Sequence, residues 1–206
     1  MAILKVDTIS GIGTEGPVFE GDIEFTSQNF LTLPKGNTTD AFPDFKAVPA
    51  ASARGIFAGG ISEPSPTKHN EIDFITIATT GNATDFGDLT QARRNLASGS
   101  SPTRGFFMGG DFQASSYYDI IDFVTIQSTG NAQDFGNLSA ARSELAAVTS
   151  TLRACVGGGY ISPSTPQTNI VEHITMATAG NMTDFGDLTV ARRQVRGCSN
   201  GHGGLG

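Results

Sequence analysis

Hydrophobic and polar residues alternate in short runs along most of the chain. In IIDFVTI (120–126), apolar side chains occur on both faces of an extended backbone, which is typical of a strand buried on both sides. Runs of this length are separated by Gly, Pro, Asn and Asp, the residues that favour turns. No segment shows the three- and four-residue spacing of an amphipathic helix. The pattern therefore predicts an all-β protein.

The same order of elements returns about every fifty residues. ARGIFAGG (53–60), TRGFFMGG (103–110) and LRACVGGG (152–159) are followed in each case by a variable loop, an alternating run, a Gly-Asn turn and an Asp-Phe-Gly element. The pattern within each unit predicts four strands. The first is short and rich in small residues, as in NLASGS, and the second ends in the Gly pair. The third is the alternating run, and the fourth is TDFGDL or its equivalent.

Four strands in about fifty residues match the number of strands and the length of one β-propeller blade. The Gly pair ending the second strand, and the aromatic residue followed by an arginine after the fourth, resemble kelch repeats, although phenylalanine stands where those repeats usually carry tryptophan. We expect blades at about 45–89, 95–138 and 144–188, with the start of a fourth at 194–206. Because a propeller closes with about four blades or more, we expect either continuation past Gly206, which we favour, or completion by neighbouring chains.

A different composition precedes the repeats, in residues 1–44. Its short β-like runs are split by turn residues, and its hydrophobic residues are too few for an independent core. The stretch ILKVDTISGIGTEGPVFEGDIEFTSQNFLTLPKGNT resembles the amino-terminal module of tail-fibre and other virion proteins of tailed marine phages of the cyanophage type. That resemblance implies attachment to baseplate, tail or collar proteins, self-association, usually as a trimer, and assembly into the virion in the host bacterial cytoplasm.

Charge and composition exclude several classes of partner. Thirteen basic residues against twenty acidic ones give a formal charge of −7, which disfavours nucleic acid as a partner. No apolar stretch is long enough to span a membrane. Two cysteines, Cys155 and Cys198, are expected to be reduced and packed. No cofactor motif is present, because the Gly-rich stretches do not lie between a strand and a helix.

The threefold Asp-Phe-Gly element favours architecture over catalysis. A protein kinase uses this tripeptide once, together with a Gly-rich loop, a strand lysine and a His-Arg-Asp loop, none of which is present. We expect the phenylalanines to fill the space between neighbouring sheets and the glycines to allow close approach or an unusual φ. The packing residues are Phe86, Phe135 and Phe185. His173 replaces a strand phenylalanine and is expected to pack rather than catalyse.

Carboxylates near the same element leave two interpretations open. One is a weak calcium site built from oxygen ligands at Asp85, Asp88, Asp184 and Asp187. The other, which we favour, is that the Asp of each tripeptide pairs with a repeat arginine or caps a turn. The arginines concerned are Arg93, Arg142 and Arg192.

Loops after the Gly pairs differ most between units. They carry aromatic groups of the kind that contact saccharide or protein surfaces: Phe112, Tyr117, Tyr118 and Tyr160. Plain solvated connections are the alternative. Together with the resemblance to phage fibre proteins, these features lead us to expect a virion structural protein without enzymatic activity, most simply a tail fibre that contacts a host-surface glycan or protein. The alternatives are a collar or head decoration, a glycan-degrading tailspike and a cellular kelch-type interaction module.

Overall fold

The computed structural model describes residues 53–64, 66–113 and 115–199. This part of the chain is all-β, as predicted, and contains no helix. It accordingly offers no helical segment that could cross a membrane. The expected attachment module at 1–44 lies outside the described residues.

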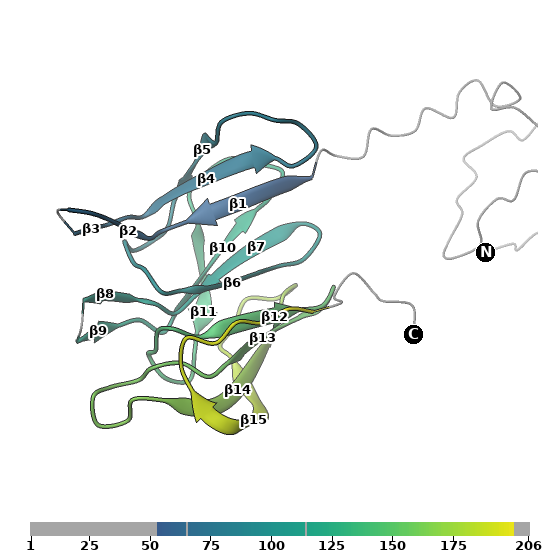
Figure 1. Ribbon diagram of the computed structural model, residues 1–206. Helices are drawn as coiled ribbons and strands as arrows, with labels where there is room; N and C mark the ends of the chain where they lie inside the picture. Colours follow the sequence, from purple (N-terminus) through teal and green to yellow (C-terminus); the bar gives the residue numbers. More distant parts are fainter. Residues whose placement is uncertain (1–52, 65, 114, 200–206) are drawn as a thin grey trace, which may run out of the picture. The chain divides into compact units, whose positions relative to one another are not determined.

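Three antiparallel sheets follow one another along the chain (Figure 1). The first sheet contains β1 (Arg54–Ala58), β4 (Glu71–Thr76) and β5 (Thr84–Asp88). The second contains β6 (Ala97–Ser100), β7 (Arg104–Met108), β10 (Ile120–Thr125) and β11 (Gln133–Asn137). The third contains β12 (Ala146–Thr149), β13 (Arg153–Gly157), β14 (Thr168–Thr175) and β15 (Thr183–Arg192).

Each of these sheets is a meander in which strands adjacent in the repeat are hydrogen-bonded neighbours. The second and third sheets contain four strands, and the described part of the first contains three. None of the sheets closes on itself. The repeat period therefore corresponds to one small sheet, with the first strands of successive sheets lying beside each other, as β6 and β12 do.

Two boundaries differ from the sequence prediction. The fourth strand of the third sheet does not end near Leu188, because β15 continues to pair with β14 as far as Arg192 opposite Thr168. Residues 194–199, predicted to be the first strand of a fourth unit, form no strand. They nevertheless lie along β12, where the Ser199 hydroxyl donates to the carbonyl of Thr149 at 2.8 Å.

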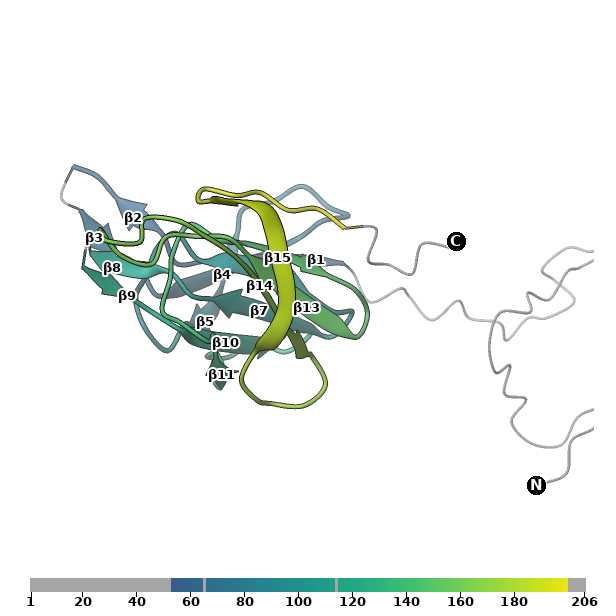
Figure 2. The same cartoon turned by 90° about the horizontal axis from the view of Figure 1, so that it is seen from below.

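The variable loops contain short hairpins that the sequence did not predict. β2 (Ile61–Ser62) pairs with β3 (Thr67–Lys68), and β8 (Asp111–Gln113) pairs with β9 (Ser116–Tyr117). Both hairpins project from the same side of the sheets in Figures 1 and 2. We call this side, with the third sheet's loop at 160–168, the loop rim.

A β-bulge occurs at the same place in every sheet, opposite the third strand. In the second sheet Ile121 lies opposite Gly136 and Asp122 opposite Asp134, so that Phe135 is the extra residue. The first and third sheets repeat this register shift at their own Asp-Phe-Gly elements. A bulge bends the strand and re-aims a side chain. Here it displaces the phenylalanine from the regular ladder.

The core lies between the sheets. One apolar cluster joins the first sheet to the second and comprises Ile72, Phe86, Leu89, Phe107, Val124 and Ala132. The other joins the second to the third and includes Phe106, Ile121, Phe135, Val156, Ile174, Met176 and Met182. The second sheet thus presents one apolar face to the first sheet and the other to the third.

Candidate functional site

The Asp-Phe-Gly elements form joints between neighbouring sheets. The carbonyl of Phe86 accepts a hydrogen bond from the amide of Gly130, in the Gly-Asn turn of the second sheet, at 2.7 Å. The corresponding bond to the third sheet runs from the amide of Gly180 to the carbonyl of Phe135 at 2.8 Å. Each fourth strand therefore offers backbone acceptors to the turn of the next sheet, which satisfies groups that an outer strand would otherwise leave unpaired.

The asparagine of each turn adds a second bond to the same joint. Asn131 Oδ1 accepts from the amide of Asp88 at 3.1 Å, and Asn181 Oδ1 accepts from the amide of Asn137 at 3.0 Å. The same bond, from a backbone amide to the asparagine Oδ1, occurs at both interfaces. The Gly-Asn dipeptide therefore contributes to the contact between sheets as well as to its own turn.

Glycine in the element permits this close approach. A Cβ on Gly87, whose φ is +145°, would lie 2.5 Å from the carbonyl of Gly130. Gly136, with φ +150°, faces Gly180 in the same way. The tight contact and the positive φ both require glycine here.

The three predicted packing residues lie in two different environments. Phe86 is 2% exposed and Phe135 is 3% exposed, and both pack in the clusters between sheets. Phe185 is instead 57% exposed, and a Cβ on Gly186 would meet nothing within 4 Å. The difference arises because the described chain places no further sheet against the third one.

A buried ion pair crosses each interface beside the joint. Arg93 Nη1 donates to Asp122 Oδ2 at 3.0 Å, and both side chains are fully buried. Thr90 donates its amide and its hydroxyl to the same carboxylate, at 3.0 and 2.7 Å. Arg93 Nη2 also donates to the carbonyl of Phe107 at 3.2 Å. Burial lowers the pKa of Arg93, and the carboxylate of Asp122 opposes that shift.

The second interface repeats this pair with a longer acid. Arg142 Nη2 donates to Glu172 Oε1 at 2.5 Å, and the amide of Ser139 donates to the other carboxylate oxygen at 3.0 Å. Burial likewise lowers the pKa of Arg142. Removing either acid would leave an arginine buried without its counter-charge, which is costly.

These pairs correct the expected partner of the repeat arginines. Arg93 and Arg142 bind carboxylates on the third strand of the next sheet, not the aspartates of the Asp-Phe-Gly elements. Asp134 instead caps its own bulge, where it accepts from the amide of Gly136 at 3.1 Å. The strand carboxylate lies within reach of the preceding sheet because its side chain points out of the opposite face from the phenylalanine next to it.

A third contact runs from the second strand of one sheet to the next sheet. Arg54 Nη1 donates to the carbonyl of Ile126 at 2.9 Å, and Arg104 Nη1 donates to the carbonyl of Met176 at 2.8 Å. Each guanidinium also lies over a phenylalanine of its own sheet, 4.6 Å from Phe74 for Arg54 and 5.0 Å from Phe123 for Arg104. The arginines thereby cover apolar rings while they bind the neighbouring sheet.

The calcium candidates do not form a group of metal ligands in the described part of the chain. Across residues 53–199, with 65 and 114 left aside, no three His, Cys, Asp or Glu side chains gather closely enough to hold an ion. Asp88 is half-buried, and the other three candidates are exposed. They lie on the fourth strands of the first and third sheets, β5 and β15: Asp85, Asp88, Asp184 and Asp187.

Two of the four predicted recognition residues meet on the loop rim. The rings of Tyr117 and Tyr160 lie 5.3 Å apart although they belong to different sheets. Desolvation, and then a hydrogen bond with Tyr160, raise the pKa of Tyr117. Arg193 lies over the ring of Tyr160 at 5.1 Å. The two rings are inclined to each other by 57°, and the group has hydroxyl and guanidinium donors at its edge.

The other two recognition residues are placed differently. Phe112 is 41% exposed and lies 5.4 Å from the ammonium of Lys68, so it belongs to the rim between the first and second sheets. Tyr118 is half-buried; its main chain bonds Gly110 and Arg142, and its phenol is close enough to Arg93 to affect the pKa of that guanidinium.

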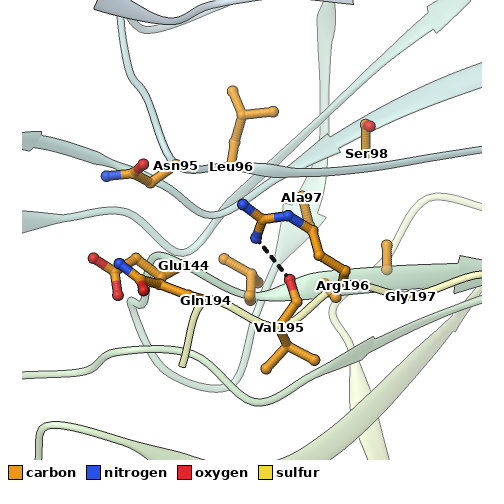
Figure 3. Close-up of a pocket in the computed structure, with 12 residues that line it drawn as sticks. Asn95, Leu96, Ala97, Ser98, Glu144, Gln194, Val195, Arg196 and Gly197 are labelled. Atoms are coloured by element: carbon orange, nitrogen blue, oxygen red, sulfur yellow. Dashed lines mark hydrogen bonds between the residues drawn. The ribbon is translucent and has the colours of Figure 1, made fainter. Parts of the chain in front are cut away.

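A cavity of about 680 Å³ lies where the first strands converge (Figure 3). The same four repeat positions line it from three units: 95–98, 144–147 and 194–197. Its first position in each unit has a left-handed backbone although it is not glycine: Asn95 at φ 54°, Glu144 at 57° and Gln194 at 54°. In Figure 3 the side chain of Arg196 lies between the segments, and Nη1 bonds the carbonyl of Val195. The lining supplies amides and charges but no catalytic pair.

The described cysteines and histidines do not form a cluster of three or more potential metal ligands. Cys155 is half-buried and burial raises its pKa, whereas Cys198 is exposed rather than packed as expected. His173 lies opposite Cys155 on β14 and makes an edge-to-face contact with Phe185 at 5.6 Å. His69 Nδ1 lies 2.9 Å from Glu71 Oε2 on the first sheet.

Neither the models of protein families nor the curated proteins contain a match to this chain. The joints and the loop rim must therefore be interpreted from their own geometry.

The carboxylates and asparagines at the interfaces between sheets were not among the predicted site residues. A signal was present, because an acidic residue interrupts the apolar third strand at the same position of each unit: Asp73, Asp122 and Glu172. A charge in the middle of a strand buried on both sides requires a partner. The repeated Gly-Asn turn was likewise interpreted only as a local turn.

Proposed function

We propose that this protein is a structural component of a phage virion, a fibre-like appendage in which kelch-like sheets hold recognition loops in fixed positions. The sheets would be blades of a partial β-propeller, and residues 1–44 would anchor the chain to the particle. The virion assignment derives from the resemblance of the first forty residues to phage fibre proteins.

One observation carries the structural part of the proposal. At both interfaces between the described sheets, the recurring polar groups are used between sheets: the arginine, the strand carboxylate, the Gly-Asn turn and the Asp-Phe-Gly backbone all contact the neighbouring sheet. The arginines and carboxylates are buried in ion pairs, and the turn and strand backbones are hydrogen-bonded to each other, so these groups serve contacts within the protein. The repeat therefore supports a scaffold more simply than an enzyme.

The loop rim supports recognition. The sheets carry loops of different sequence on one side, and the rings of Tyr117 and Tyr160 contact each other across two of them. Aromatic rings with polar edges suit saccharides or protein surfaces. Several copies on one particle would raise the overall strength of binding even where each contact is weak.

Mass spectrometry of purified virions, together with adsorption assays, tests this function. We expect the chain in the particles, and we expect the isolated protein to bind host cells and compete with adsorption. A chain lacking residues 1–37 should still bind cells but fail to enter particles. Unchanged incorporation would contradict the anchor. Release of soluble sugar fragments from host envelope glycans would instead favour a glycan-degrading tailspike, and incorporation without cell binding would favour a decoration protein.

Tyr160→Ala is expected to weaken binding to host cells about tenfold, because it removes the partner of Tyr117 and the ring beneath Arg193. Binding of a fluorescently labelled protein to cells measures the effect. Leu152→Ala is the matched control, since Leu152 is exposed and stands apart from the loop rim at the start of the third sheet's hairpin. If both variants lose binding equally, or if neither loses binding, the loop rim has no role in recognition.

A further inference from the structure

The first and third sheets each present an interface surface that the described chain leaves uncovered. We call the two surfaces the incoming and outgoing faces. The incoming face belongs to the first sheet and comprises Phe57, Asp73, Ile77, Gly81 and Asn82. The outgoing face belongs to the third sheet and comprises Arg153, Phe185, Thr189 and Arg192. Figure 2 views the third sheet with β15 in front.

Every position of the incoming face is used at the two internal interfaces. Asp73 corresponds to Asp122 and Glu172, the buried partners of the arginines. Gly81 corresponds to Gly130 and Gly180, which donate to the preceding sheet, and Asn82 corresponds to the asparagines of the joints. On the first sheet Asp73 is exposed, whereas Asp122 and Glu172 are buried.

The outgoing face carries the matching groups. Arg192 corresponds to Arg93 and Arg142 but is exposed, and Thr189 stands at the position of Thr90. Arg153 corresponds to Arg54 and Arg104, which donate to the carbonyls of Ile126 and Met176. Ile77 occupies the position of these two acceptors on the first sheet. Gly186 has the positive φ of the other joint glycines and open space where a Gly-Asn turn would lie.

Apolar exposure marks both surfaces. Phe57 is 61% exposed although its equivalent Phe107 is buried, and Ile77 is 63% exposed although its equivalent Met176 is buried. Phe185 is exposed on the outgoing face, while its equivalents are buried. Large apolar groups that are rimmed by complementary charges mark an interaction surface.

We propose that the outgoing face of one chain binds the incoming face of a second copy of this chain, head to tail. In this interface Arg192 pairs with Asp73 of the second copy, the amide of its Gly81 donates to the carbonyl of Phe185, and its Asn82 accepts from the amide of Asp187. The contact is a third instance of the interface that the chain already makes twice. It does not depend on a virion role.

A second copy fits better than an unrelated partner because the surface has four separate requirements. The partner must supply a carboxylate, a Gly-Asn turn, a free strand carbonyl and an apolar cover in one spatial arrangement, and the first sheet has all of them on one face. Opposite charges face each other although the whole chain carries −7. A head-to-tail contact of this kind gives a ring where the rotation closes and a filament where it does not.

Charge reversal tests the proposal, with the full 206-residue chain. We expect the unaltered protein to associate in analytical ultracentrifugation or light scattering. D73R and R192E should each weaken association by about a hundredfold, because each places like charges together at the centre of the interface. An equimolar mixture of D73R and R192E should associate again, since the mixture restores one original interface and one with exchanged charges.

Recovery in the mixture separates this contact from other modes of association. A trimer formed through residues 1–44 would respond to neither variant, and E63R, which reverses an exposed charge on a loop of the first sheet, should associate like the unaltered chain. If the unaltered chain is still monomeric at roughly 100 μM, the proposal is wrong. Association that persists in both single variants, or loss that the mixture does not reverse, would also overturn it.

Discussion

Asp122→Ala is expected to lower the free energy of unfolding by about 3–5 kcal/mol. Its carboxylate is fully buried, balances the buried guanidinium of Arg93 and accepts two hydrogen bonds from Thr90. The substitution leaves a positive charge and an amide unpaired between the first and second sheets. Urea unfolding followed by circular dichroism measures the change.

The same substitution one unit earlier is the matched control. Asp73 occupies the equivalent position on the first sheet but is exposed, so Asp73→Ala should change stability by less than about 0.5 kcal/mol at a protein concentration at which copies do not associate. Replacing Arg93 and Asp122 together by Met and Leu should recover much of the loss, because no charge is then left alone. Equal effects at positions 73 and 122 would contradict a stabilising role for the buried pair.

Gly87→Ala should destabilise the protein by roughly 2–6 kcal/mol. Part of this cost is backbone strain at φ +145°, about 1–3 kcal/mol. The rest is overpacking, about 1–3 kcal/mol, because the new methyl group would lie 2.5 Å from the carbonyl of Gly130 and force the two sheets apart. Thermal or urea unfolding of the variant measures the sum.

Gly186→Ala separates the two contributions. Gly186 has a φ of +137°, so the strain remains, but its Cβ would point into open space. We expect a loss of about 1–3 kcal/mol from strain alone, again under conditions in which the chain is monomeric. If Gly87→Ala and Gly186→Ala cost the same, the close approach at the joint contributes nothing.

Local sequence predicted the strands well because strands depend on local alternation. The Gly pairs, the alternating third strand and the turn residues are visible in the sequence of each unit, and the all-β fold agrees with them. The length of β15 was not predictable in this way. Its continuation to Arg192 depends on pairing with β14, a contact between distant residues.

Burial of equivalent residues could not be predicted, because it depends on what lies beside each sheet. NATDFGDLT and NMTDFGDLT differ at one position, yet Phe86 is buried and Phe185 is exposed. The partner of Arg93 was missed for the same reason: Asp85 is near in sequence, but Asp122 is near in space. The contact between Tyr117 and Tyr160 likewise depends on how the loops of two units lie beside each other.

Amide hydrogen exchange at three equivalent glycines tests most directly whether the Asp-Phe-Gly elements join the sheets. In the monomeric protein we expect the amides of Gly130 and Gly180 to exchange at least about a hundred times more slowly than that of Gly81, because only the first two donate to a preceding sheet within the described chain. Similar exchange at all three glycines, measured by NMR, would contradict the joints and with them the scaffold on which the proposed function rests.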